Sequence, residues 1–275
     1  MNCGQSSLGF LYIRNMNKFT FIVSVCAALF FAACGDDSSS ATSSSDYSSS
    51  SVVKSSSSVI HISSSAMLVL VDPSTVVIDF ITDSRDGQSY KTVTIGSQTW
   101  MAQNLNYETA NSYCYNDSTK YCEKYGRLYT WAAAMDSAGS WSTNGKGCGF
   151  KKTCSLTNPV RGACPTDWHL PKIAEFETLF IAVGGKSTAG KILKSTSGWY
   201  QGHNGSNAYS FSALPAGDSN YNEDYDGEGH YAVFWSSTEY SSDYAYRMYL
   251  DYDIDNVGLY YYFKSNGFSV HCVKD

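Results

Sequence analysis

The sequence predicts an α+β domain in which an antiparallel sheet packs against two helices and disulfides hold the chain. Short segments that alternate apolar and polar residues fill the C-terminal part of the chain, which is typical of strands. One stretch near the middle instead repeats its apolar residues at helical spacing. The last alternating segments are separated by short turns, and such turns join antiparallel neighbours.

The first predicted elements are two strands and two helices. The strands are 90–95 and 99–105, separated by a glycine turn. An alanine-rich stretch predicts the first helix over 128–135. The second helix is predicted over 169–183, because Pro171 suits a first helical turn and the apolar stripe ends at a pair of glycines.

The rest of the domain is predicted as strands joined by short loops. Their ranges are 233–236, 245–254, 259–264 and 268–273. Four tryptophans fall in predicted elements and are expected in the core: Trp100, Trp131, Trp168 and Trp235.

The N-terminus predicts export and lipidation. An apolar run of about 15 residues follows Lys18 and is too short for a spanning helix, which needs roughly 20. A positive flank, a short apolar core and small residues before a cut indicate a signal peptide over 1–33. The segment FAAC at 31–34 resembles a lipobox, so we expect a lipid on Cys34 and an anchor in the cell envelope, in the outer membrane. An ordinary secretory signal with a chance cysteine is the alternative.

A serine-rich stretch follows the expected anchor. Residues 34–65 cannot bury enough apolar surface to offset their ordering entropy, so they predict a disordered tether. The more apolar segment 66–80 is either a linker or an accessory strand, interrupted by Pro73. The folded domain is predicted over 81–275. The net charge of −6 disfavours nucleic acid as a partner.

The cysteines predict a disulfide framework. Of nine in the chain, Cys3 and Cys26 fall in the signal peptide and Cys34 in the lipobox, which leaves an even number in the exported part. Fifteen pairings are possible. Local spacing favours two short loops, which leaves a third, long-range bridge: Cys114–Cys122, Cys148–Cys154 and Cys164–Cys272.

Several segments resemble the Fibrobacter major paralogous domain, a family of exported bacterial proteins. They are DSRDGQSYKTVTIGSQTWMAQNLNY (83–107), YGRLYTWAAAM (125–135), CPTDWHLPKIAEFETL (164–179), FSALPAG (211–217), FWSSTEY (234–240) and FSVHCVKD (268–275). The stretch WHLPKIAEFETL is also similar to the helix start of sulfatase-modifying-factor domains. These resemblances imply a C-type-lectin-like architecture with two helices, a curled antiparallel sheet and termini brought together. They supply no catalytic residues.

The loop 218–230 is a candidate calcium site. Its side chains offer oxygen ligands at alternate positions, which suit Ca²⁺. The candidate ligands are Asp218, Asn222, Asp224, Asp226 and Glu228. The loop is not an EF-hand, because Val233 stands where the closing glutamate would be. A solvated polar loop is the alternative. Asp251, Asp253 and Asp255 are expected on one face of the strand 245–254.

Aromatic residues in the loops are candidates for ligand binding, because flat rings stack on sugar faces while neighbouring Asn and Asp side chains bind hydroxyls. The first candidates are Trp199, Tyr200, Tyr221, Tyr225 and Tyr240, and Tyr244 and Tyr260–Tyr262 are further candidates. The alternative is that these rings serve a β-rich fold, since tyrosine is a good strand former.

Together these observations predict a surface-anchored, non-catalytic binding module that recognises carbohydrate or another extracellular ligand. A protein–protein adhesion module and an extracytoplasmic enzyme of unknown reaction are the alternatives. The sequence carries no nucleophile elbow, P-loop or HExxH motif, so we expect no catalytic residues. The expected partners are the membrane that holds the anchor and a polysaccharide or cell-surface protein.

Overall fold

A computed structural model describes residues 70–222 and 224–275. The predicted signal peptide, the lipidation at Cys34 and the tether 34–65 lie outside these residues. Within the described ranges, no helix is long and apolar enough to span a bilayer.

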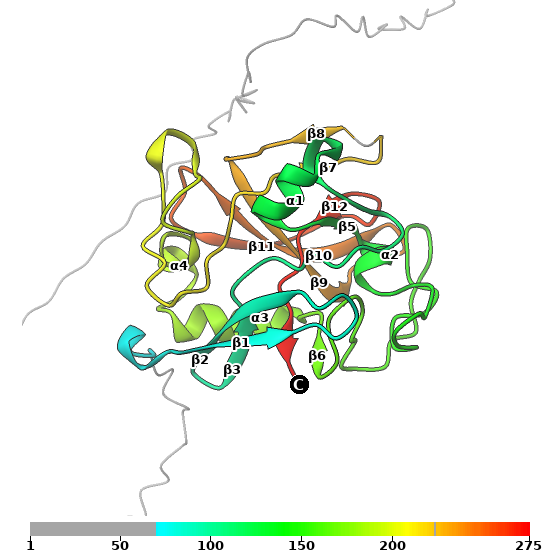
Figure 1. Cartoon of the computed structure of the whole chain (residues 1–275), viewed down its shortest axis with the longest axis horizontal. Coiled ribbons are helices and arrows are strands. Elements are labelled where there is room, and N and C mark those ends of the chain that lie inside the picture. Colours follow the sequence, from blue (N-terminus) through cyan, green and yellow to red (C-terminus); the bar gives the residue numbers. More distant parts are fainter. Residues whose placement is uncertain (1–69, 223) are drawn as a thin grey trace, which may run out of the picture. The chain divides into compact units, whose positions relative to one another are not determined.

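The first sheet brings the two ends of the described chain together. Its strands are β1 (Val77–Thr82), β2 (Ser89–Ile95), β3 (Gln98–Met101), β13 (Val273–Lys274) and β6 (Trp168–His169), in that spatial order. Every pairing is antiparallel. In Figure 1, β1 and the C-terminus accordingly both lie at the bottom of the molecule, in one sheet with β2 and β3 between them.

A three-stranded sheet forms the middle of the domain. Its order is β11 (Val257–Phe263), β10 (Tyr244–Asp251) and β9 (Tyr231–Glu239), again antiparallel. Along β10 the alternation is clear: Met248 and Leu250 are fully buried, whereas their neighbours are partly exposed. One face of this sheet is therefore committed to the core, and the other carries partly accessible side chains.

A second five-stranded sheet consists of very short strands. Its order is β4 (Ser112–Tyr113), β5 (Leu128–Thr130), β12 (Gly267–Phe268), β7 (Asp218–Ser219) and β8 (Tyr225–Asp226). All its pairings are antiparallel, so the domain is a mixed helix-and-sheet fold built on curled antiparallel sheets.

Within residues 70–222 and 224–275, four short α-helices and three single 3₁₀ turns accompany the sheets. The helices are α1 (Thr119–Tyr125), α2 (Trp131–Ala134), α3 (Ile173–Ala182) and α4 (Lys186–Leu193), and the turns are η1 (Pro73–Thr75), η2 (Tyr115–Asp117) and η3 (Tyr200–Gly202). The helix α3 lies between the first sheet and the three-stranded sheet. Its Phe176 ring stacks on Trp100 of β3 at a centroid distance of 5.4 Å, and both belong to one core cluster with Phe234 and Met248.

The four tryptophans expected in the core are buried there, which confirms that prediction. The four tryptophans are divided between two large hydrophobic clusters. Trp100 lies in the cluster that contains α3, and the other three lie in a second cluster beside β5 and β12.

The predicted elements differ from the observed ones mainly where long-range pairing overrides local preference. The first predicted helix begins as β5, because Tyr129 pairs with Phe268 of β12. The second begins only at Ile173, because a residue before proline favours extended backbone and Leu170 precedes Pro171. The backbone N–H of Lys172 then donates to Glu175, which caps α3.

Other predicted strands are shorter than expected. The strand predicted over 99–105 ends at Met101 in β3, and 268–273 contributes only the ends of β12 and β13. The helices α1 and α4 were not predicted from the sequence.

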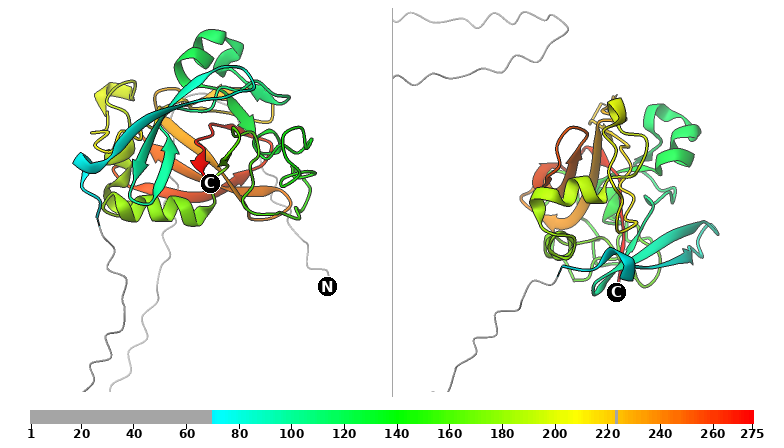
Figure 2. Two further views of the ribbon diagram at one scale, coloured as in Figure 1. Left: turned by 60° about the horizontal axis from the view of Figure 1, so that its bottom comes forward. Right: turned by 90° about the vertical axis from the view of Figure 1, so that its left-hand side faces the viewer.

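The folded domain extends before residue 81, where its boundary was predicted. Pro73 begins η1, and β1 then pairs with β2 from Val77 to Thr82. The backbone N–H of Val71 also donates to the carbonyl of Ala182 at 2.9 Å. The segment before 81 therefore acts as an accessory strand. In the right-hand view of Figure 2, the β1–β2 ribbon projects from the body of the domain.

Among the residues that the structure describes, three disulfides join six cysteines in the pairing that local spacing favours: Cys114–Cys122, Cys148–Cys154 and Cys164–Cys272. The third is buried and joins residues 108 positions apart. In the chain-entropy model, a loop of that size stabilises the fold by about 4–5 kcal/mol.

Candidate functional site

A pocket of about 370 Å³ lies between the β7–β8 hairpin and the three-stranded sheet. We call it the Arg247 pocket. The hairpin contributes Asp218, Asn220, Asp224 and Asp226. The pocket is therefore bounded on this side by carboxylate and amide oxygens.

The opposite wall is aromatic and surrounds one cation. Arg247 and Tyr249 alternate along β10 on the face turned away from Met248. Tyr231 of β9 and Tyr262 of β11 complete this wall. The rings of Tyr231 and Tyr249 lie 5.5 Å apart, so they form a continuous surface beside the arginine.

The Arg247 guanidinium is held by rings alone. Its central carbon lies 4.7 Å from the ring centroid of Tyr249, 4.9 Å from that of Tyr262 and 5.3 Å from that of Phe268. Among the described residues it makes no hydrogen bond or ion pair, and its buried Nε has no partner. Burial lowers the pKa of Arg247, although the group stays charged at any ordinary pH. A forked donor set is therefore available to a ligand in this pocket.

Asp218 lies near this cation without bonding to it. Burial raises the pKa of Asp218 from 3.8 to about 6; the charge of Arg247 opposes this shift, and Asp226 adds to it. Asp226 is its partner across the β7–β8 ladder. A partly buried carboxyl and a partly buried guanidinium thus face one pocket while each keeps bonding capacity.

Tyr249 and Tyr231 carry polar groups into the same region. The Tyr249 hydroxyl donates to Asp251 at 2.6 Å. Burial raises the pKa of Tyr231, and nearby carboxylates, with Asp251 the strongest, raise it further. Both phenols therefore stay neutral near pH 7 and remain able to donate and accept hydrogen bonds.

The hairpin that forms the acidic wall is stiffened from within. The Asn220 side-chain oxygen accepts the backbone N–H groups of Asn222 at 2.7 Å and Asp224 at 3.1 Å. This local turn satisfies the backbone at the tip of the loop.

The segment η2–α1 clasps the same hairpin from outside. Tyr225 of β8 donates to Asp117, and its ring lies 5.3 Å from that of Tyr115. Glu228 accepts from the Tyr125 hydroxyl at 2.9 Å and from Lys124 at 3.1 Å. The Cys114–Cys122 disulfide closes this segment on itself, so we call η2–α1 the disulfide clasp. Figure 1 shows α1 beside β7 and β8 at the top of the domain.

The five residues predicted as calcium ligands do not converge. Asp218, Asp224 and Asp226 line the Arg247 pocket, but Glu228 bonds to α1 and Asn222 lies exposed at the hairpin tip. In residues 70–222 and 224–275, no three His, Cys, Asp or Glu side chains are placed to hold a metal ion. The structure therefore places three of the five predicted ligands along one pocket and two elsewhere, and the calcium site stays a prediction.

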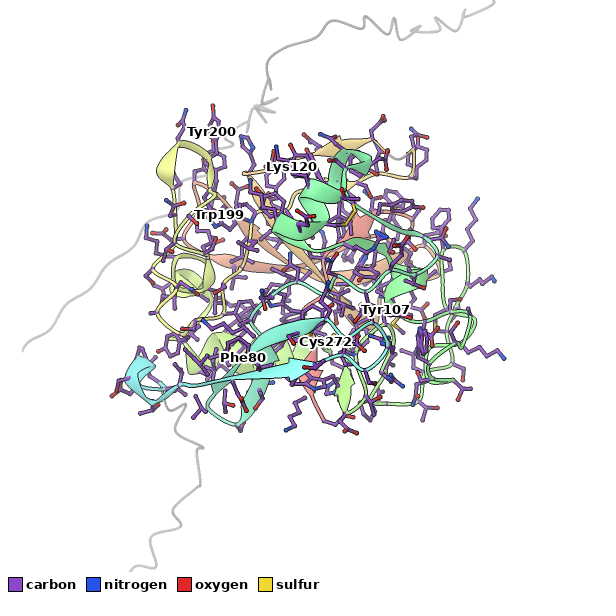
Figure 3. The ribbon with its side chains drawn as sticks, in the orientation of Figure 1. Phe80, Tyr107, Lys120, Trp199, Tyr200 and Cys272 are labelled. Carbon is purple, nitrogen blue, oxygen red and sulfur yellow. A yellow bond between two sulfur atoms is a disulfide. The ribbon has the colours of Figure 1, made fainter. Side chains whose placement is uncertain are left out.

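The predicted aromatic ligand residues are also scattered. Trp199 is buried, and its indole N–H donates to Ser195 at 3.0 Å, so its assignment to the surface is wrong. Its neighbour Tyr200 is 44% exposed. Figure 3 shows Tyr200 at the tip of its loop and Trp199 nearer the body of the domain.

The other three predicted rings lie in different places. Tyr221 is exposed at the hairpin tip, Tyr225 packs against the disulfide clasp, and Tyr240 stacks on Tyr261 at 3.9 Å. None of these five lines the Arg247 pocket among the residues that the structure describes, whereas the further candidate Tyr262 does.

The three aspartates expected on one strand face are separated. The strand β10 ends at Asp251, and Asp253 and Asp255 lie in the turn that follows. The ammonium of Lys194 binds carbonyl oxygens of this turn, at 2.9 Å from both Asp251 and Tyr252. That contact bends the chain out of the strand and breaks the alternation.

Sequence reasoning missed Arg247, Tyr231 and Tyr249. One signal was present: Arg247 stands in an otherwise aromatic and apolar alternating run, AYRMYL, at 245–250. A lone cation on the partly exposed face of such a strand indicates a site, since a solvated strand face would carry several charges.

Comparison with curated proteins finds no match. Residues 93–274 match the Fibrobacter succinogenes major domain, which covers β3 to β13 and every residue of the Arg247 pocket. The chain therefore belongs to the Fibrobacter succinogenes major domain family.

Proposed function

We propose that this domain is a non-catalytic binding module that recognises an uncharged carbohydrate in the Arg247 pocket. The observation that carries the proposal is the Arg247 guanidinium, which is packed among three rings and has no hydrogen-bond partner among the described residues. Buried polar groups in folded proteins are normally paired, so a donor fork without a partner at a pocket indicates a ligand that supplies one.

The chemistry of the pocket suits a polyhydroxylated ligand. Sugar hydroxyls both donate and accept, so they can take protons from Arg247 and give them to Asp218 or Asn220. The rings of Tyr231 and Tyr249 offer apolar surface to C–H groups. Three carboxyl groups against one guanidinium disfavour an anionic ligand, which leaves a neutral one as the best fit.

The architecture that we propose is C-type-lectin-like. Both ends of the described chain share one sheet, a buried disulfide joins Cys164 to Cys272, and a long loop region separates α4 from β9. We further propose that a lipid on Cys34 holds the domain at the outer membrane and that the serine-rich tether 34–65 gives it reach.

Protein–protein adhesion is the second candidate, and the edge strand β11 favours it. Three consecutive tyrosines on this strand are exposed: Tyr260 by 55%, Tyr261 by 46% and Tyr262 by 41%. Exposed tyrosines on a sheet edge are typical of protein-binding surfaces.

A binding screen distinguishes the two candidates. The mature chain, applied to a glycan array and to soluble polysaccharides in affinity gels, is expected to be retained by a neutral glycan. Arg247→Ala should abolish retention, whereas Tyr240→Ala removes an exposed ring away from the pocket and should leave it unchanged. Loss of retention in both variants, or in Tyr240→Ala alone, would favour the tyrosine surface of β11 instead.

A further inference from the structure

A second group of rings lies on the surface beyond the Arg247 pocket. Tyr200 of η3 stacks on His230 with centroids 4.3 Å apart and planes 26° apart. Tyr252 meets both rings edge-on, at 5.5 Å from Tyr200 and 5.1 Å from His230. His203 meets Tyr252 at 5.5 Å. We call these four residues the Tyr200 cluster.

The fold holds this cluster in place without burying it. The backbone N–H of Tyr200 donates to Gly229 at 2.8 Å, which ties η3 to the loop that carries His230. Gln201 adopts a left-handed backbone with φ of 50°, an uncommon conformation for a residue other than glycine. The buried Trp199 anchors the base of the turn. The ring of Tyr200 is thus held at the surface, with one face on His230 and much of the residue exposed to solvent.

The cluster is continuous with the pocket. His230 precedes Tyr231, and their ring centroids lie 6.1 Å apart. Tyr231 in turn contacts Tyr249, and Tyr249 contacts Arg247, at centroid distances of 5.5 Å and 4.7 Å. A continuous series of ring contacts therefore connects the Arg247 guanidinium to Tyr200.

The cluster also supplies directional hydrogen-bonding groups. The Nδ1 of His230 lies 3.1 Å from the carbonyl oxygen of Glu228. Because a carbonyl can only accept, Nδ1 donates there, and the neutral ring keeps Nε2 as an acceptor. This acceptor lies at the edge of the Tyr200–His230 stack, where a ligand hydroxyl beside the two rings would meet it.

We infer that the ligand of the Arg247 pocket is an oligosaccharide whose neighbouring sugar units rest on the Tyr200 cluster. This inference depends on the carbohydrate-binding function proposed above, and it adds a second subsite and a chain-length requirement. A ligand confined to the pocket would not contact the Tyr200 cluster. An oligosaccharide would contact both the Arg247 pocket and the Tyr200 cluster.

The test is a calorimetric titration of the full mature chain with linear β-1,4-linked gluco-, xylo- and manno-oligosaccharides of increasing length. Affinity for the preferred series is expected to rise with length and then level off. Tyr200→Ala should lower the affinity for the longest oligosaccharide about tenfold, the scale of one lost aromatic contact, and leave that for the shortest binder unchanged. Arg247→Ala should lower the affinity for every length.

Three controls keep the outcomes separate. Tyr200→Trp preserves a flat ring and should retain the length dependence, while unchanged thermal unfolding of Tyr200→Ala excludes a folding defect. Affinity that is independent of length, or a Tyr200→Ala loss that is equal at all lengths, would overturn the second subsite alone. If no oligosaccharide and no polysaccharide binds the wild-type chain, the proposed function itself fails.

Discussion

Replacing Arg247 by methionine should separate stability from binding. The buried Nε without a partner costs about 1–3 kcal/mol in the folded state. The three surrounding rings offset this with about 0.5–2 kcal/mol each in cation–π attraction. A methionine has similar length and makes sulfur–aromatic contacts of about 0.3–1.5 kcal/mol without a charge to desolvate. We therefore expect the free energy of unfolding to stay within about 1 kcal/mol of wild type.

Arg85→Met is the matched control. Arg85 also stacks on a ring, at 3.8 Å from Tyr107, but it bonds to the buried Asp83 at 2.6 Å and to the carbonyl of Ala163. Its removal leaves Asp83 buried and uncompensated, which should cost about 3–5 kcal/mol.

Urea unfolding measures the stability of both variants, provided that the dependence of unfolding free energy on urea concentration keeps the same slope. The affinity gel measures whether Arg247→Met still binds glycan. Equal destabilisation by Arg247→Met and Arg85→Met would show that Arg247 has a structural role, and the argument for a ligand in this pocket would collapse.

Three further predictions concern pH and the disulfides. Burial raises the pKa of Asp218 from 3.8 to about 6, so stability falls as pH rises through that interval. Urea unfolding of Asp218→Asn should show a stability advantage over wild type that grows from pH 4 to 6 and then stays level; a constant difference would contradict the shift. The pKa of His169 is raised above its usual 6.5. Burial alone would lower this pKa, but the hydrogen bonds to Glu175 and Asp275 have the larger combined effect. The stability that this pair of contacts provides is full below pH 6.5 and is lost as pH rises through the folded pKa, and His169→Gln should remove that pH dependence in the same assay. Replacing Cys164 and Cys272 together by serine should lower the free energy of unfolding by about 4–5 kcal/mol, and a loss below about 1 kcal/mol would refute the chain-entropy estimate.

Local patterns predicted the parts of the fold that depend on local forces. The stripe that begins at Ile173 has one periodicity over its whole length, so α3 and its buried face were predictable. The bonds Cys114–Cys122 and Cys148–Cys154 close short loops and were favoured by spacing alone.

Long-range packing decided what the sequence could not predict. The alanine-rich segment after Leu128 has helical composition, yet β12 recruits its first residues into a sheet. Trp199 and Tyr200 are adjacent and alike in character, yet the first packs in a core cluster and donates to Ser195 while the second is exposed. Arg247 and Asp218 lie on separate elements, and their approach depends on how the β7–β8 hairpin folds over β10.

The acidic wall of the Arg247 pocket depends on formation of the Cys114–Cys122 disulfide in the clasp. Glu228 and Tyr225, which frame the acidic wall of the pocket, are held by a segment that a disulfide closes. A chain whose thiols are still reduced lacks that closure, so the wall loses the constraint that orders it. The wall of the Arg247 pocket is therefore fully constrained only once the Cys114–Cys122 bond has formed, and this bond forms under oxidising conditions.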